Sequence, residues 1–225
     1  KLCFVSAAAQ QAFALSNPSR VVENALQSPL PPQRNTQQLG VFCLLLPGRY
    51  NAIKGQDIAI EAVALLPKEQ RLLVHLKLVG DVYADQHHFR TRLQSLIESR
   101  GLTTTVSLHP FTQDLAPYYA QASAVLCPSV QPESFGLVAL EGMAHSLPVI
   151  ASEIGGLAAL VQPRVNGLLV PPGDAKALCA AIQTLLTAPE DAAAMGKAGY
   201  RKVKQYYLPG RFENDFRRYA REVFG

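Results

Sequence analysis

Residues 41–79 have the sequence VFCLLLPGRYNAIKGQDIAIEAVALLPKEQRLLVHLKLV. The stretch opens and closes with short apolar runs, 41–46 and 74–79, which are typical of buried strands. Between them a pattern with helical period extends from Gln56 to Leu66, and Pro67 ends it. Because a helix is the usual crossover between parallel strands, the stretch predicts one strand–helix–strand unit of a parallel sheet.

The same alternation continues beyond this unit. Further strands are expected at residues 105–108, 124–127, 149–151 and 168–170. Helices are expected at residues 88–100, 115–122, 135–145, 157–161 and 174–186, the last capped by Asp174, with two more at 189–207 and 211–224. The predicted fold class is therefore α/β, with a Rossmann-like parallel sheet and helices on both faces.

A different kind of segment precedes the sheet. Residues 1–24 predict a strand–helix–strand fragment, too small to bury its own apolar faces, and residues 28–38 are rich in Pro and Gln, as a linker is. We therefore divide the chain into residues 1–38, a sheet domain at 39–188 and carboxyl-terminal helices at 189–225.

Composition describes an ordinary globular protein. Of its 225 residues 48% are hydrophobic and 17% charged, and no apolar run reaches the roughly 18–20 residues that a membrane span needs. The amino-terminal stretch lacks the features of a signal peptide. Four widely spaced cysteines (Cys3, Cys43, Cys127 and Cys179) form no Cys-x-x-Cys pair and are expected to be small buried hydrophobes, which favours a cytoplasmic location.

The carboxyl-terminal segment is basic. From Lys197 onward it holds eight Lys or Arg against three Asp or Glu, a net charge of +5 in a chain of +4. Nucleic acid is one reading, but a basic helix is more often a solvated face or a patch near anionic lipid, so we expect no nucleic acid and possible peripheral contact with the inner membrane face. An apolar stripe (Phe212, Phe216, Tyr219, Val223 and Phe224) is expected to pack on residues 1–24.

Residues 132–142, PESFGLVALEG, carry the most informative motif. They follow an expected strand and open a helix at the carboxyl edge of the sheet, where doubly wound folds bind ligands. Ser134 is expected to be the N-cap, with the amides of residues 135–137 aimed at an anion. Glu133 and Glu141 could accept hydrogen bonds from sugar and ribose hydroxyls. Alternatively, Glu133 only complements the helix dipole and Glu141 is an ordinary exposed residue.

Residues 47–55, PGRYNAIKG, place two cations at the same edge. An Arg fork and a Lys point charge suit a diphosphate, whose charge must be neutralised as it leaves. Alone, Arg49 and Lys54 would be unremarkable surface residues. Beside a helix start that favours anions, they indicate a binding site.

Several stretches together resemble the carboxyl-terminal domain of family 4 (group 1) retaining glycosyltransferases, which have the GT-B fold of two facing Rossmann-like domains. The stretches that carry the resemblance are Gly48-Arg49, Lys54-Gly55, Leu78-Val79-Gly80-Asp81, the Glu133-x7-Glu141 pair around Ser134-Phe135-Gly136, Pro148-Val149-Ile150-Ala151, Gly155-Gly156 and residues 166–174 (NGLLVPPGD). The resemblance implies transfer of a sugar from a nucleotide diphosphate sugar to an acceptor, expected to be a glycan or a lipid-linked glycan, with retention at the anomeric carbon.

The resemblance also implies roles for individual residues. Arg49 and Lys54 would bind the diphosphate, Glu141 the ribose and Glu133 the donor sugar, and Glu133, Arg49 and Lys54 would be the catalytic residues. The donor-binding set implied is Gly48, Arg49, Lys54, Gly80, His109, Pro110, Glu133, Ser134, Phe135, Gly136, Leu137, Val138 and Glu141, with the residues at 80, 109 and 110 lining the base. No Asp-x-Asp motif is present, so we expect neither a metal nor a cofactor.

By the same resemblance, residues 1–38 would be the end of an amino-terminal acceptor domain followed by a linker, which makes that domain an expected partner. One departure is Ala159, where the family usually has Glu after the glycine pair. A Rossmann oxidoreductase would need Gly-x-Gly-x-x-Gly after a strand, and the chain has none. A sugar-nucleotide epimerase of the same scaffold and a binding module that is inactive alone remain alternatives.

Overall fold

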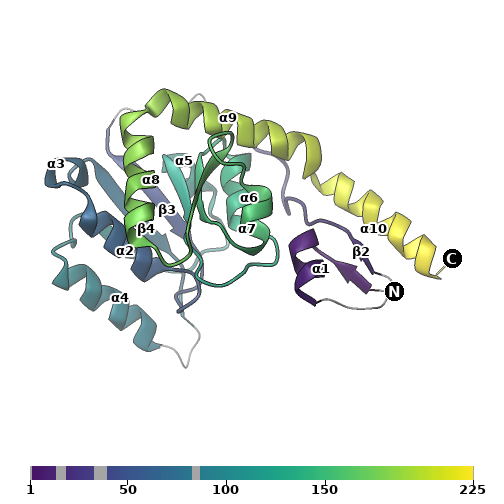
Figure 1. The fold of residues 1–225 in the computed structure, drawn as a ribbon, viewed down its shortest axis with the longest axis horizontal. Helices are drawn as coiled ribbons and strands as arrows, with labels where there is room; N and C mark the ends of the chain where they lie inside the picture. The colour runs from purple at the N-terminus through teal and green to yellow at the C-terminus, as the bar shows by residue number, and fades with distance from the viewer. Residues whose placement is uncertain (1, 14–18, 33–39, 83–86, 225) are drawn as a thin grey trace.

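The computed structural model describes residues 2–13, 19–32, 40–82 and 87–224 (Figure 1). The strands are β1 (Leu2–Phe4), β2 (Ser19–Val21), β3 (Phe42–Pro47), β4 (Val74–Val79), β5 (Val106–His109), β6 (Ala124–Cys127), β7 (Val149–Ser152) and β8 (Gly167–Val170). The helices are α1 (Ala7–Phe13), α2 (Gln56–Leu65), α3 (Lys68–Arg71), α4 (His87–Ser99), α5 (Ala116–Gln121), α6 (Leu137–Ala144), α7 (Gly155–Leu160), α8 (Ala175–Thr187), α9 (Pro189–Tyr206) and α10 (Pro209–Phe224).

The main sheet is parallel throughout its described strands, in the order β5-β4-β3-β6-β7-β8. The first strand of the domain, β3, lies at the centre, and the chain builds outward first on one side and then on the other. This order is that of the doubly wound nucleotide-binding folds. The order reverses between β3 and β6, so their carboxyl ends flank the switch point.

Helices cover both faces of the sheet, as expected from strands that are apolar on both sides. Leu44 and Leu46 face the core formed with α2, α4 and α8, whereas Leu45 faces the core formed with α5, α6 and α7. The alternation follows from the two-residue period of a strand. The predicted fold class is confirmed. The sequence analysis did not predict the one-turn helix α3.

Residues 2–13 and 19–24 form a second, smaller unit, in which α1 lies between the parallel strands β1 and β2 along the chain. It lies beside α10, at a distance from the main sheet (Figure 1). Arg211 Nη2 donates to the backbone oxygens of Glu23 (2.8 Å) and Asn24 (3.1 Å), and Arg20 pairs with Glu222. These contacts place α10 beside this unit as expected, whereas the packing of its apolar stripe there stays a prediction. The stripe is only partly covered, because Phe216 remains 48% exposed.

The four cysteines are free; Cys43, Cys127 and Cys179 are buried, but Cys3 is exposed because it lies in the small two-stranded unit rather than in the main sheet. The expectation that all four are buried was therefore wrong for Cys3. Among the described residues, no helix is both long and apolar enough to cross a bilayer.

Helix α9 joins the two units, running along the main domain before the chain continues into α10 (Figure 1). It adds Met195 to one core of the main domain and Val203 to the other. Gly196 makes its close approach possible, because a Cβ there would lie 2.0 Å from the carbonyl oxygen of Ser146. The division of the sequence at residue 188 stays a prediction.

We expect Gly196→Ala to lower the melting temperature, because the added methyl group must push α9 away from the Ser146 carbonyl. Overpacking of this kind costs about 1–3 kcal/mol, and each 1 kcal/mol shifts the melting temperature by about 2–4 °C in a chain of this size. Gly210→Ala is the matched control, because a Cβ there has no atom within 4 Å. Equal melting temperatures for the two variants, measured by calorimetry, would contradict the packing described for α9.

Candidate functional site

The candidate site is formed by two loops that leave the sheet at the switch point. One loop, residues 48–55, connects β3 to α2, and the other, residues 128–136, connects β6 to α6. The loops pack on each other: the amide of Val130 donates to the Ile53 oxygen at 2.8 Å, and a Cβ on Gly55 would lie 2.0 Å from the Pro128 oxygen. The fold therefore brings the two predicted motifs together.

Backbone hydrogen bonds fix the first loop to the end of β4 and the residues just after it. Gly48 donates to Val79 and Tyr50 to Asp81, both at 2.9 Å. Gly80 must be a glycine, because a Cβ there would lie 2.0 Å from the Gly48 oxygen. The fully buried Tyr50 adds a further tie, since its hydroxyl shares its proton between the Leu78 and His109 oxygens, at 2.8 and 2.7 Å. The loop is therefore fixed before any ligand arrives.

Side chains within this loop set the positions of its two cations. Gln56 Nε2 donates to the Arg49 oxygen at 2.8 Å, and the Asn51 carboxamide oxygen accepts from the Lys54 amide at 3.0 Å. Lys54 Nζ then reaches across to Glu133 Oε1 at 2.8 Å. This ion pair is the direct side-chain link between the two predicted motifs.

The start of α6 differs from the prediction. The helix begins at Leu137 rather than at residue 135, and its N-cap is Gly136, with φ 97°, not Ser134. Only glycine adopts this left-handed conformation without strain, and the Ser134 oxygen is turned to accept a hydrogen bond from the Ser6 hydroxyl. The expectation that Ser134 caps the helix was wrong. The first-turn amides are those of residues 137–139, one turn of the helix, while Phe135 is buried in the core.

Glu133 lies where the two loops and α7 meet. Its carboxylate accepts from Lys54 and from the hydroxyl of the buried Ser129, and its backbone oxygen accepts from the Gly156 amide at 2.7 Å. The side chain is only 17% exposed. Glu133 is therefore a tightly held acceptor rather than a loose surface charge.

Glu141 lies in the second turn of α6 and is half-buried. Burial raises the pKa of its carboxyl group above the usual range, while a hydrogen bond from the Tyr119 hydroxyl to Oε2, at 2.8 Å, acts in the opposite direction. Partly buried carboxylates with raised pKa values are concentrated at functional sites. The alternative that Glu141 is an ordinary exposed helix residue does not fit this environment.

A cavity of about 520 Å³ lies between the start of the first loop, the segments that follow β4 and β5, and the first two turns of α6. Its lining contains five residues of the predicted donor-binding set (Gly48, Arg49, Gly80, Val138 and Glu141) and three neighbours from the quoted motifs (Pro47, Val79 and Asp81). The other lining residues, Val82, Phe111, Thr112 and Leu115, were not predicted from the sequence. Lys54 and Glu133 lie on the side of the first loop that faces the second. Phe111 is notable because it is 66% exposed. The signal in the sequence that could have identified it was an aromatic residue just after a predicted strand.

His109 and Pro110 do not line this cavity. The His109 ring makes an edge contact with Tyr118 and lies 2.9 Å from the Ser107 hydroxyl. Burial, with the nearby charge of Lys77, lowers its pKa below the usual value for histidine. Phe111 and Thr112, later in the same loop, line the cavity in place of the predicted His109 and Pro110.

The arrangement combines a cavity lined by Arg49 and Glu141 with a nearby ion pair, Lys54 and Glu133, just before the start of α6, which suits a ligand with both a phosphate group and hydroxyl groups. Within the described ranges, no group of three or more His, Cys, Asp or Glu residues could hold a metal ion.

Comparison with known families agrees with this chemistry. The sequence profile described as glycosyl transferases group 1 matches residues 32–202. The chain belongs to this family.

Two curated relatives illustrate the similarity of this group 1 chain to full-length proteins. The D-inositol 3-phosphate glycosyltransferase of Arthrobacter sp. (strain FB24) is 33% identical over 172 residues, which cover 73% of this chain and 40% of that protein. The protein of the same name from Xylanimonas cellulosilytica is 37% identical over 145 residues, covering 64% and 33%. The chain thus matches well under half the length of each of these relatives.

Solved structures show the same architecture. Anabaena Alr3699/HepE in complex with UDP has a TM-score of 0.88 and 26% identity, over 98% of this chain and 63% of that chain. The complex of that protein with UDP-glucose gives a TM-score of 0.89 over the same shares of the two chains. The carboxyl-terminal domain of the group 1 family protein LpcC from Francisella tularensis shares the fold, with a TM-score of 0.69 and 24% identity over 76% of this chain and 88% of that one.

The raised pKa of Glu141 can be tested by measuring how the stability of the protein depends on pH. Because its folded-state pKa lies above the unfolded one, the stability contributed by this group falls as the pH rises from below about 4.3 through the folded pKa. We expect Glu141→Gln to have the wild-type melting temperature below that range and a higher one at neutral pH, by about 2–4 °C for each 1 kcal/mol relieved. Tyr119 can still donate to the amide oxygen.

The control for this test is Glu98→Gln, which removes an exposed carboxylate of α4 and should give no gain that grows with pH. A Glu141→Gln variant whose melting temperature stays parallel to that of the wild type across the pH range would show that burial does not penalise the Glu141 charge.

Proposed function

We propose that this chain forms the donor-binding part of a retaining glycosyltransferase, which binds a nucleotide diphosphate sugar at the edge of the sheet between β3 and β6. The observation that carries the proposal is the contact between Lys54 and Glu133, at 2.8 Å, beside the cavity lined by Arg49 and Glu141. It supports the proposal because a cation suited to a diphosphate and a carboxylate suited to sugar hydroxyls lie next to each other, as the junction between phosphate and sugar requires.

Each part of the donor has a counterpart among these residues. Arg49 and Lys54 neutralise the diphosphate, which develops charge as the glycosidic bond breaks, and the first-turn amides of α6 add hydrogen-bond donors. Glu141 accepts from the ribose, and Glu133 from the donor sugar. Glu133, Arg49 and Lys54 are thus the proposed catalytic residues, with Gly48 and the 134–138 segment close to the ligand.

The base is proposed to lie against Gly80 and the exposed ring of Phe111, with Thr112 and the 109–110 segment beside it. UDP is the first nucleotide to test, because Anabaena Alr3699/HepE, 26% identical to this chain, has been solved in complex with UDP and with UDP-glucose. We propose that binding needs no metal or cofactor, the charge of the diphosphate being met by Arg49, Lys54 and the helix start.

The transfer reaction requires an acceptor as well. The chain spans only 33–40% of the two curated relatives described above, so the reaction is proposed for a longer protein in which a facing domain holds the acceptor, a glycan or a lipid-linked glycan. Positioning of both reactants can supply roughly 7–11 kcal/mol of a barrier. Residues 1–24, which contact the site through the Ser6 hydroxyl at the Ser134 oxygen, are proposed to belong to that facing domain.

We expect Arg49→Ala and Lys54→Ala each to weaken UDP binding at least tenfold, because a charge-assisted hydrogen bond is worth about 1.5–3 kcal/mol. Isothermal calorimetry of the 225-residue chain, with and without EDTA, measures both the affinity and the metal requirement. Lys68→Ala is the control, since Lys68 is an exposed cation of α3, outside the site.

Unchanged UDP affinity in the Arg49 and Lys54 variants, with melting temperatures intact, would overturn the assignment of the diphosphate. A requirement for Mg²⁺ or Mn²⁺ would overturn its metal-free character.

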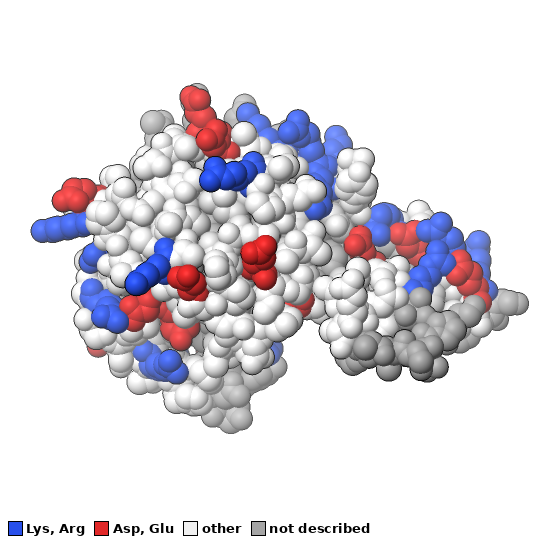
Figure 2. All heavy atoms as spheres, viewed as in Figure 1, with Lys and Arg blue, Asp and Glu red and all other residues white. Residues whose placement is uncertain are grey.

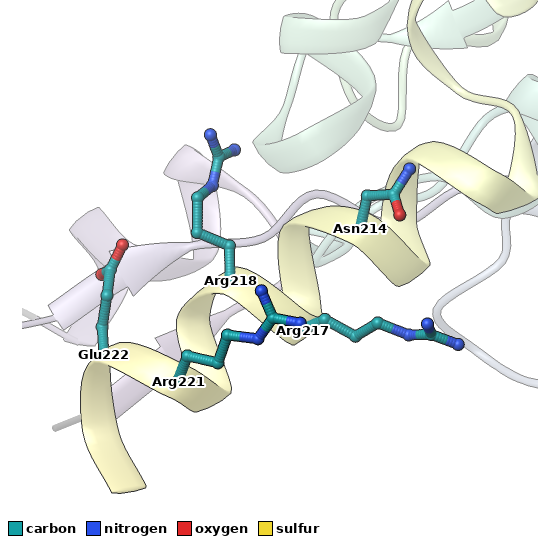
Figure 3. A pocket seen from close by; sticks show the side chains of 5 residues that line it. All are labelled: Asn214, Arg217, Arg218, Arg221 and Glu222. Atoms are coloured by element: carbon teal, nitrogen blue, oxygen red, sulfur yellow. The ribbon is translucent and has the colours of Figure 1, made fainter. Parts of the chain in front are cut away.

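We further propose that α10 contacts an anionic membrane surface. A shallow hollow of about 470 Å³ on this helix is lined by Asn214, Arg217, Arg218, Arg221 and Glu222, whose side chains extend away from the helix axis (Figure 3). Basic side chains also gather along the neighbouring edge where α9 lies (Figure 2). The exposed Phe216 adds an apolar group of the kind that enters the headgroup region.

We expect the double variant Arg217→Glu/Arg221→Glu to bind vesicles containing phosphatidylserine at least tenfold more weakly than the wild type, since each basic residue near such a surface contributes about 1 kcal/mol. The control is Lys68→Glu/Lys176→Glu, which makes the same change in net charge at exposed positions of the main domain. Flotation with and without phosphatidylserine measures the binding. Equal losses in both double variants would mean that net charge, and not α10, determines the attraction.

A further inference from the structure

The Tyr119 side chain hydrogen-bonds to Glu141 from the interior of the domain. It lies on the short helix α5 and is 2% exposed, and its hydroxyl donates to Glu141 Oε2 at 2.8 Å. Leu115, one turn earlier on the chain, lines the same cavity as Glu141. The hydrogen bond therefore connects the interior of the domain to the wall of the cavity.

The tyrosine is itself fixed in place. Its ring stacks on that of His145, with centroids 4.7 Å apart and planes inclined by 13°. His145 is the C-cap residue of α6. The Tyr119 side chain therefore contacts this helix at two points, at Glu141 and at its carboxyl end. Burial, and then the adjacent Glu141, raise the pKa of Tyr119 well above its usual value. Its hydroxyl therefore stays protonated and remains a donor at physiological pH.

A second buried tyrosine shows what a purely structural partner looks like. The Tyr50 hydroxyl shares its one proton between two backbone oxygens, those of Leu78 and His109, and both are uncharged. Tyr119 instead donates to a half-buried carboxylate whose charge the domain has to tolerate. The bond uses Oε2 and leaves Oε1 as the oxygen that can accept from a ligand in the cavity.

We propose that Tyr119 is a positioning residue that fixes the Glu141 carboxylate for a ribose hydroxyl and so makes the site selective for ribonucleotides over deoxyribonucleotides. The inference rests on the proposed function, because it concerns the ribose of a bound nucleoside diphosphate. Tyr119 itself does not contact the ligand. Its effect passes entirely through the orientation and charge of Glu141.

The test is the binding of UDP, its 2′-deoxy and 3′-deoxy analogues, and pyrophosphate to Tyr119→Phe, measured by calorimetry. We expect the affinity for UDP to fall about tenfold, as for the loss of one hydrogen bond to a charged group, and the affinity for pyrophosphate to stay unchanged. One of the two deoxy analogues lacks the hydroxyl that Glu141 binds. The ratio of the affinity for UDP to the affinity for that analogue should fall toward one. A structural defect would weaken all of these ligands together.

The pH dependence gives a second readout. A hydrogen bond to the ionised form lowers the pKa of a carboxyl group, so removal of the Tyr119 hydroxyl raises the pKa of Glu141. As the pH is lowered, UDP affinity in Tyr119→Phe should therefore begin to fall at a higher pH than in the wild type. Tyr118→Phe is the matched control, since it removes the hydroxyl of the adjacent tyrosine and should leave the profile unchanged.

Glu141→Asp keeps the charge but shortens the reach to Tyr119 by one methylene, and it should lose the same discrimination even if Tyr119→Phe folds poorly. A Tyr119→Phe protein that keeps both the wild-type preference for UDP and the wild-type pH profile would overturn the inference and leave the proposed function standing. A Glu141→Asp protein that keeps both would overturn the inference together with the ribose role of Glu141. Failure of the wild-type chain to bind UDP or any other nucleoside diphosphate would instead overturn the proposed function.

Discussion

The ion pair between Lys54 and Glu133 joins two loops that are 79 residues apart in the sequence and adjacent in space. It exists because the strand order reverses between β3 and β6, which brings the loop after each strand to the same point of the sheet edge. Both partners are partly exposed, so the pair contributes little to stability. Its importance is geometric, since it fixes a cation and a hydrogen-bond acceptor side by side where the two loops meet.

The fold could be predicted from the sequence because the strands of a doubly wound sheet are buried on both faces. Phe42 to Leu46 is apolar at every position, and such runs stand out between amphipathic helices. The α6 cap could not be predicted in the same way. Ser134 has the better cap chemistry, but its backbone is held by Ser6, 128 residues earlier, and Gly136 supplies the left-handed turn instead. The deciding contact is non-local.

Which residues gather at the candidate site could be predicted for a similar reason, while their roles in binding stay predictions. Arg49, Lys54, Glu133 and Glu141 follow strand ends, and a parallel sheet brings strand ends together. His109 is the last residue of β5, and its ring lies on the same strand face as Ser107, to which it hydrogen-bonds. The ring therefore lies against a face of the sheet and does not reach the cavity at its edge. Tyr119 could not be identified from the sequence, because its role depends on the packing of α5 against α6. The charge of Glu141 persists in a half-buried position that costs stability, which is a common property of functional sites.

Amide hydrogen exchange of the 225-residue chain, with and without saturating UDP, shows which backbone segments the nucleotide protects, because it reports every segment at once. We expect slower exchange in two separated stretches, residues 48–55 and the first turn of α6 at residues 137–139, with no change in α10. Protection of only one of these stretches, or protection confined to α9 and α10, would contradict the claim that the two loops at the switch point form one nucleotide site.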